Sequence, residues 1–146
     1  MAEALGICSS IIAILELTQK AVEYFRDVKD ATDDRWKLLS EVLGVKNLLV
    51  LLKDKLENQH PDTWSGSVQM LLGPEGPLTR MQKLLQKILA KLDPVEGWRR
   101  HTKALKWPFQ KDEIMGHLAT IERCKTLISL ALNSDHMYGQ LSRFIP

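Results

Sequence analysis

Cysteine is scarce in this sequence, and so is net charge. Among 146 residues there are two cysteines, Cys8 and Cys124, and their spacing matches no metal-binding motif. Two isolated thiols suit a reduced, cytoplasmic protein better than a disulfide-stabilised one. A formal net charge of +2 is too small to indicate nucleic-acid binding. Since 45% of the residues are hydrophobic and 26% are charged, we expect one ordinary globular domain over residues 1–146.

The motifs of common enzyme classes are also missing. The sequence has no glycine-rich phosphate-binding loop, and its four histidines form no H-E-x-x-H metal site. His117 and Cys124 could share a helical face, but two ligands do not make a metal site. Ser134, Asp135 and His136 are consecutive, so on a helix they point about 100° apart and cannot form a catalytic relay. The sequence therefore predicts a protein that is not an enzyme, with no cofactor and no bound metal.

No alternating, strand-like pattern occurs, and the apolar residues repeat at helical spacing instead. The pattern predicts four helices, at about 2–26, 32–58, 77–93 and 111–140, and a short extra helix near 98–106 in the linker before the last one. Pro77 can open the third helix, where its missing N–H costs nothing. Amphipathic helices on short linkers predict an all-α four-helix bundle.

Each expected helix has one apolar seam. The second helix repeats apolar residues at intervals of four and three, and Trp36 and Val50 are expected to widen its buried stripe. Leu127 is expected to face inward in the last helix. The predicted seams are Ile7, Ile11, Ile14, Thr18, Ala21 and Phe25; Leu38, Val42, Val45, Leu49, Leu52 and Leu56; Leu78, Met81, Leu85, Ile88 and Leu92; and Ile114, Leu118, Ile121, Leu127, Ile128, Ala131 and Leu132.

The first helix departs from this pattern, because its apolar residues point in nearly every direction. Residues 4–15 contain no charged side chain. A helix that is apolar all round must be buried in protein or in lipid. The acidic Glu3 has the wrong sign for a secretory signal, and Glu16 interrupts the run of about 18 apolar residues that a constitutive membrane span needs. We therefore expect this helix to be packed inside the resting bundle. The residues that would enter a membrane if it left the bundle are Leu5, Ile7, Ile11, Ile12, Ile14, Leu15 and Leu17.

A basic segment precedes the last helix. Residues 97–111 hold five basic side chains and no acid. This segment could bind anionic lipid headgroups, each cation contributing about 1 kcal/mol near a membrane surface. The alternative is a solvated linker in which Trp107 and Phe109 cover the end of the bundle. The candidate headgroup residues are Arg99, Arg100, Lys103, Lys106 and Trp107.

Four motifs follow one another in a recognisable order. The chain opens with M-A-E-A-L-G-I-C-S-S-I-I-A, and L-G-P-E-G-P-L follows at 72–78. K-A-L-K-W-P-F stands at 103–109, and L-I-S-L-A-L at 127–132 precedes Asp135-His136. Together they resemble the HeLo-like N-terminal domain of fungal NOD-like receptors and related NACHT- or ankyrin-containing proteins. The resemblance extends over essentially the whole chain.

The resemblance implies a cell-death or incompatibility effector domain that belongs to a longer parent protein with a NACHT domain and repeats. In such a domain, self-association releases the first helix, which then permeabilises the membrane. The implied partners are further copies of the chain and anionic membrane lipids, with no nucleic acid. The chain would be cytoplasmic at rest and at the plasma membrane when active. Glu3 and Glu16 would then face the pore.

The alternative function is a structural oligomerisation or autoinhibitory module that never touches lipid. Burial of Leu5, Ile12 and Leu15 along with the seam would mean that the bundle alone explains the apolar first helix. Exposure of any of them would favour an interface.

Overall fold

The computed structural model describes residues 2–27, 33–58, 70–71, 73–92 and 108–144, and their side chains from Gly6 to Asn133. Four helices are formed, as predicted: α1 (Ala2–Asp27), α2 (Asp33–Asn58), α4 (Pro77–Leu92) and α5 (Lys111–Phe144). Over these ranges the chain is all-helical, with no strand. The short helix predicted at 98–106 lies outside the described residues.

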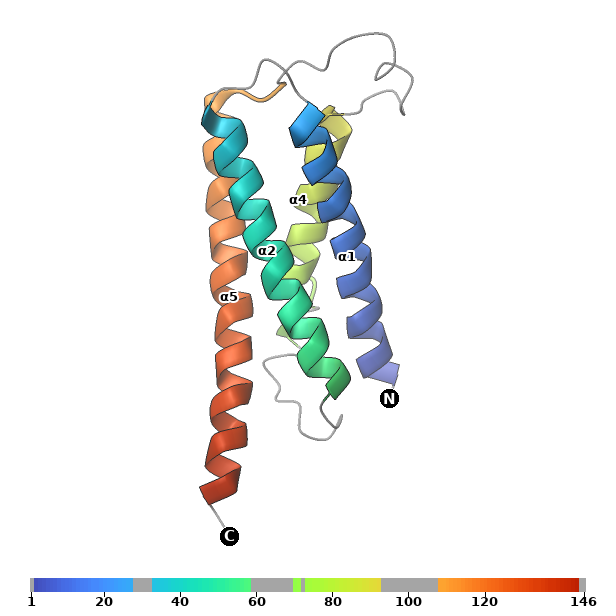
Figure 1. Ribbon diagram of the computed structural model, residues 1–146, viewed down its shortest axis with the longest axis vertical. Coiled ribbons are helices and arrows are strands. Elements are labelled where there is room, and N and C mark those ends of the chain that lie inside the picture. Colours follow the sequence, from blue (N-terminus) through green and yellow to red (C-terminus); the bar gives the residue numbers. More distant parts are fainter. Residues whose placement is uncertain (1, 28–32, 59–69, 72, 93–107, 145–146) are drawn as a thin grey trace.

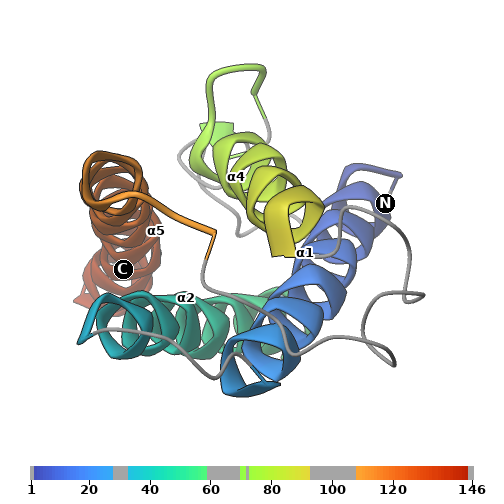
Figure 2. The same cartoon turned by 90° about the horizontal axis from the view of Figure 1, so that it is seen from above.

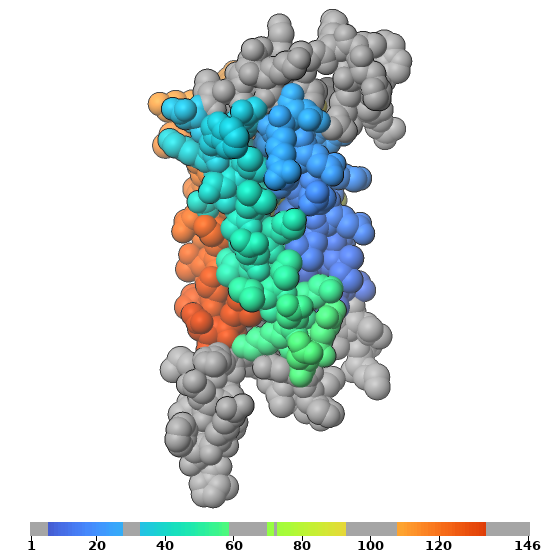
Figure 3. Space-filling model, in the orientation of Figure 1, coloured from blue at the N-terminus to red at the C-terminus, as the bar shows by residue number. Residues whose placement is uncertain are grey.

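The helices run alternately up and down and form one four-helix bundle (Figure 1). α1 packs against α2 and α4, and α5 packs against the same two helices. Viewed along the bundle, α1 and α5 therefore occupy opposite corners (Figure 2). On the face shown in Figure 3, α1 and α2 lie side by side. The longest helix, α5, extends past the ends of its neighbours (Figure 1).

The predicted seams form the core. All six seam residues of α1, all six of α2 and all five of α4 are buried. In α5, Ile114, Ile121, Ile128 and Ala131 are buried, whereas Leu118 and Leu132 are half-buried against the core. Because the seams repeat every three or four residues, each helix turns one continuous stripe toward its neighbours.

Three residues predicted to face inward do not. Trp36, in the first turn of α2, is 59% exposed, and its ring lies under the Arg35 guanidinium at 4.8 Å. Val50 is 40% exposed and Leu127 is 36% exposed. All three lie at the edges of apolar stripes that are wider than the contact between neighbouring helices, so the core covers only the centre of each stripe.

Polar contacts join the helices outside the core. Lys125 Nζ lies 2.8 Å from Glu41 Oε2, which links α5 to α2. Lys91 pairs with Glu113, which links α4 to α5. Between α1 and α2, Lys46 Nζ donates to Gln19 Oε1 at 3.2 Å. Exposed pairs of this kind contribute at most about 1 kcal/mol each, so the apolar core remains the main source of stability.

A tight turn precedes α4, and its geometry explains the G-P-E-G-P motif. The backbone N–H of Leu78 donates to the Leu71 carbonyl at 3.2 Å, and that of Gly76 donates to the Gly73 carbonyl at 2.8 Å. A Cβ on Gly76 would lie 2.7 Å from the Met70 carbonyl oxygen and closer still to that of Leu71. The turn therefore requires glycine at 76, and Pro77 then opens α4 as predicted.

We expect Gly76→Ala to lower the free energy of unfolding by about 1–3 kcal/mol, the usual cost of overpacking, because the turn backbone must shift. Gly116→Ala is the matched control in α5, where no atom lies within 4 Å of the added Cβ. It should be neutral or stabilising, by up to about 1 kcal/mol, since alanine is the better helix former. Urea unfolding followed by circular dichroism measures both. Equal effects of the two substitutions would contradict this account of the turn.

Candidate functional site

The apolar residues of α1 divide into a buried and a peripheral group. Ile7, Ile11 and Ile14 are buried, and Leu15 and Leu17 are half-buried against the core. Ile12 is 44% exposed. The bundle therefore accounts for most of the apolar character of α1 but not for Ile12, and exposure of this residue is the outcome that favours an interface. The side chain of Leu5 lies outside the described residues.

The predicted acidic and basic site residues are placed only in part. Glu16 is exposed on α1, while the side chain of Glu3 lies outside the described residues. The candidate headgroup residues lie outside them too: Arg99, Arg100, Lys103, Lys106 and Trp107. Phe109, which follows them, is buried. Its ring meets His117 edge-to-face, with centroids 5.9 Å apart, as expected of a residue that covers the end of the bundle.

Thr18 is the one buried polar side chain among the residues whose side chains are described. Its hydroxyl donates to the Leu15 carbonyl at 2.7 Å, one turn earlier in the same helix. A buried hydroxyl without a partner costs free energy. Because this one is satisfied inside α1, the hydrogen bond can move with the helix.

The two cysteines have little nucleophilic character in the folded state. Burial raises the pKa of the Cys124 thiol. Burial, together with the nearby Glu57 carboxylate, raises the pKa of Cys8. Less thiolate is therefore present at neutral pH than on a free cysteine. Within the described part of the chain, no three potential ligands are grouped to hold a metal ion.

No described helix is both long and apolar enough to cross a membrane by itself. In α1, Glu16, Lys20 and Glu23 interrupt the apolar sequence, as the sequence indicated.

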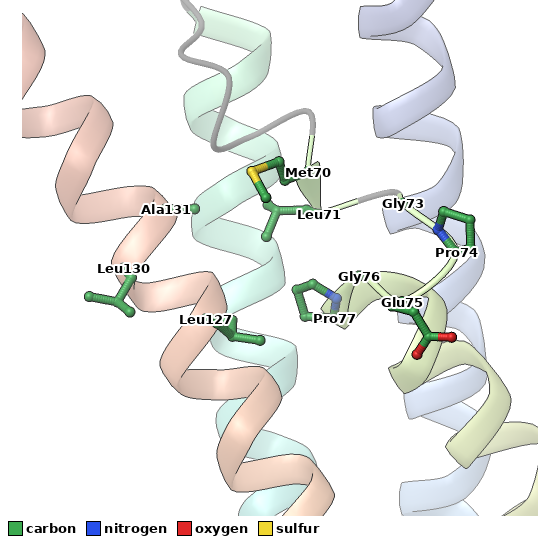
Figure 4. A pocket seen from close by; sticks show the side chains of 10 residues that line it. All are labelled: Met70, Leu71, Gly73, Pro74, Glu75, Gly76, Pro77, Leu127, Leu130 and Ala131. Atoms are coloured by element: carbon green, nitrogen blue, oxygen red, sulfur yellow. The ribbon is translucent and has the colours of Figure 1, made fainter.

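An apolar cavity of about 570 Å³ lies between the turn before α4 and α5 (Figure 4). From α5, Leu127 points toward Pro77 across this cavity (Figure 4). Met70 and Leu130, which also line it, are 75% and 56% exposed. Sequence reasoning missed the site because it placed Leu127 in the core. The remaining lining residues are Leu71, Gly73, Pro74, Glu75, Gly76 and Ala131.

A second cavity of about 440 Å³ lies further along the same two helices and is basic. Lys83 and Lys87 of α4 line one side, and His117 and Gly116 of α5 line the other. Burial lowers the pKa of His117; the Glu113 carboxylate opposes this, and the positive charges of Lys87 and Lys91 add smaller lowering effects. The histidine is therefore neutral at physiological pH.

The lowered pKa of His117 predicts a loss of stability in mild acid. The unfolded chain takes up a proton near the ordinary histidine pKa of 6.5, whereas the folded chain does so only at lower pH. The free energy of unfolding should fall as the pH drops from about 7.5 to about 5.5, on either side of that value. In His117→Gln, urea unfolding at the two pH values should show a smaller fall. An equal fall in both proteins would contradict the prediction.

Comparison with known proteins gives no relative. No family model matches the chain, and neither a curated protein nor a solved structure is significantly similar to it.

Proposed function

We propose that this chain is a non-enzymatic effector or signalling domain that self-associates on activation and acts on membranes through α1. The HeLo-like motifs suggest this function, and the bundle described above is its resting state. The observation that carries the proposal is that the buried face of α1 depends on no hydrogen bond to another helix. Its buried face is apolar, and the hydroxyl of Thr18 is satisfied by Leu15 within the helix. Moving α1 therefore leaves no broken buried hydrogen bond at Thr18.

The cost of releasing α1 explains why activation would be needed. Burial of Ile7, Ile11, Ile14 and Phe25 contributes roughly 1.5–3 kcal/mol for each side chain. The sum, about 6–12 kcal/mol, is comparable to the whole stability of a typical domain, about 5–15 kcal/mol. A monomer thus keeps α1 in place. Self-association and contact with lipid together must replace the lost burial.

Insertion into a membrane also favours an oligomer. α1 has 26 residues, which at 1.5 Å per residue reach about 39 Å, enough to cross a hydrocarbon core of ~30 Å. An acidic residue such as Glu16 near the middle of an inserted helix costs about 2.5 kcal/mol or more. In an oligomer Glu16 would face a water-filled lumen and avoid most of this cost.

The second candidate function is a structural oligomerisation or autoinhibitory module without membrane activity. It is favoured by the burial of Ile7, Ile11 and Ile14, because core packing alone explains their apolar character. The two functions differ in what the core-facing side of α1, with Leu15 at its edge, contacts in the active state. This side meets lipid in the first and protein in the second.

Leu15→Glu should abolish membrane permeabilisation and leave the resting bundle folded, since the side chain is only half-buried at the edge of the core. It is about 100° from Glu16 around the helix, so it faces lipid when Glu16 faces the lumen. On an inserting helix the new charge costs about 2.5–3.5 kcal/mol, which is roughly a hundredfold in the insertion equilibrium. The matched control is Leu48→Glu on α2, where the side chain is also half-buried against the core. Dye release from anionic-lipid vesicles is measured for each protein as a monomer and when clustered by a fused oligomeric tag.

Only the clustered wild type and the clustered Leu48→Glu variant should release dye. Release by clustered Leu15→Glu at the wild-type rate would contradict insertion of α1. No release by any folded, clustered protein would favour the interaction module.

Locking α1 onto α2 tests the release step. Gln19 and Lys46 are hydrogen-bonded across the two helices at 3.2 Å, so cysteines at these positions can be joined by a short bis-maleimide linker that contains a reducible disulfide. Cys8 and Cys124 are replaced by alanine. The locked, clustered protein should release no dye, and reduction of the linker should restore release. Equal release before and after reduction would show that α1 stays in the bundle.

A further inference from the structure

α4 carries a basic stripe along one side. Its 16 residues contain four cations and no acid. The cations Arg80, Lys83, Lys87 and Lys91 are three or four residues apart, so they lie on the same side of the helix. Two of them are neutralised by partners outside α4, since Arg80 pairs with Glu75 at 3.3 Å and Lys91 pairs with Glu113.

The middle of the stripe keeps its charge. Within the described part of the chain, Lys83 and Lys87 form no ion pair. Both line the basic cavity of about 440 Å³, and so does the carboxylate of Glu113, whose charge is paired with Lys91. On its α5 side, Gly116 leaves open space, with no atom within 4 Å of an ideal Cβ. Two uncompensated lysines beside an open cavity are suited to a phosphate group.

The basic cavity adjoins the apolar one. Arg80 lines the basic cavity, Glu75 lines the apolar cavity, and these two side chains form an ion pair at 3.3 Å. On α5, Thr120 lines the basic cavity and Leu127 lines the apolar one; they are seven residues, or about 10 Å, apart along the helix. The α4–α5 groove, defined as these two cavities, is thus basic at one end and apolar at the other.

We propose that the α4–α5 groove binds an anionic amphiphile, a single molecule that carries a phosphate group and an acyl chain. Lys83 and Lys87 hold the phosphate, and Met70, Pro77 and Leu127 contact the chain. A purely polar ligand would leave the apolar end in water, and a purely apolar ligand would leave the two lysines unused. Both volumes, about 570 and 440 Å³, fall in the usual range of ligand sites, about 300–1,000 Å³. This binding does not require α1 to leave the bundle.

Three soluble probes distinguish the two ends of the groove: lysophosphatidic acid, lysophosphatidylcholine of the same chain length, and glycerol 3-phosphate. The second lacks net charge and the third lacks the chain. Isothermal titration below the micelle concentration should show saturable 1:1 binding of lysophosphatidic acid, with the other two at least about tenfold weaker, since each loses one class of contact. If lysophosphatidylcholine or glycerol 3-phosphate bound as tightly as lysophosphatidic acid, the proposal would be overturned. The absence of saturable binding of lysophosphatidic acid would also overturn it.

Two double variants, one in the groove and one elsewhere, test where the phosphate group binds. Lys83→Gln with Lys87→Gln should weaken binding of lysophosphatidic acid about thirtyfold, at about fivefold for each lysine–phosphate contact. Lys20→Gln with Lys37→Gln removes the same charge from exposed positions on α1 and α2 and should change affinity less than about twofold, through long-range charge alone.

The apolar end is tested in the same way. Met70→Gln with Leu127→Gln alters two exposed positions of the groove, and Val50→Gln with Leu51→Gln alters two exposed positions of α2. Only the first pair should weaken binding. Circular dichroism checks that every variant stays folded. Equal losses of affinity in the groove variants and the control variants would overturn the assignment. A change from monomer to dimer on adding the probe would also overturn it, because a second copy of the chain would then occupy the groove.

Discussion

Burial of the α1 seam between α2 and α4 is the constraint on which the rest of the structure depends. Ile7, Ile11, Ile14 and Phe25 are almost fully buried, and α1 is in contact with both neighbours along the bundle (Figure 2). Removing this helix would expose the seams of α2 and α4 to water. The packing of α1 therefore both stabilises the domain and sets the free energy that release of α1 would require.

The side of the bundle away from α1 is built differently. There α5 contacts α2 and α4, and polar pairs such as Glu41–Lys125 and Lys91–Glu113 add to the apolar core. The Gly76 turn sets the start of α4 against α5 and leaves the α4–α5 groove beside it. The domain thus combines a helix held mainly by apolar contact with an opposite side that has cavities of mixed polarity. Such a division would let one side move while the other keeps its shape.

Much of the fold could be predicted from the sequence, because helical periodicity is a local signal that one chain contains in full. The seams of α1, α2 and α4, and the role of Pro77 at the start of α4, were all recovered. Trp36, Val50 and Leu127 were misplaced, since the width of an apolar stripe does not show how much of it a neighbouring helix covers. Phe109 was placed correctly because a large ring next to a proline at the end of a bundle has few other sites to occupy.

The candidate sites were harder to predict than the fold. The α4–α5 groove depends on which residues of two distant helices meet, and neither cavity has a local motif. The basic side chains of α4 are visible in the sequence, but no local pattern shows that Gly116 and His117 of α5 lie opposite them. The exposure of Ile12 likewise depends on the angle at which α1 packs on α2.

The most direct test of the central account is the distance between spin labels at positions 19 and 46, measured by pulsed electron paramagnetic resonance in a protein with Cys8→Ala and Cys124→Ala. In the bundle, Gln19 and Lys46 are hydrogen-bonded across α1 and α2 at 3.2 Å, so labels at these positions lie close together. If clustering on anionic vesicles releases α1 from α2, the distance within one molecule, measured after dilution into unlabelled protein, becomes much longer. An unchanged distance in the clustered, vesicle-bound protein would contradict the release of α1.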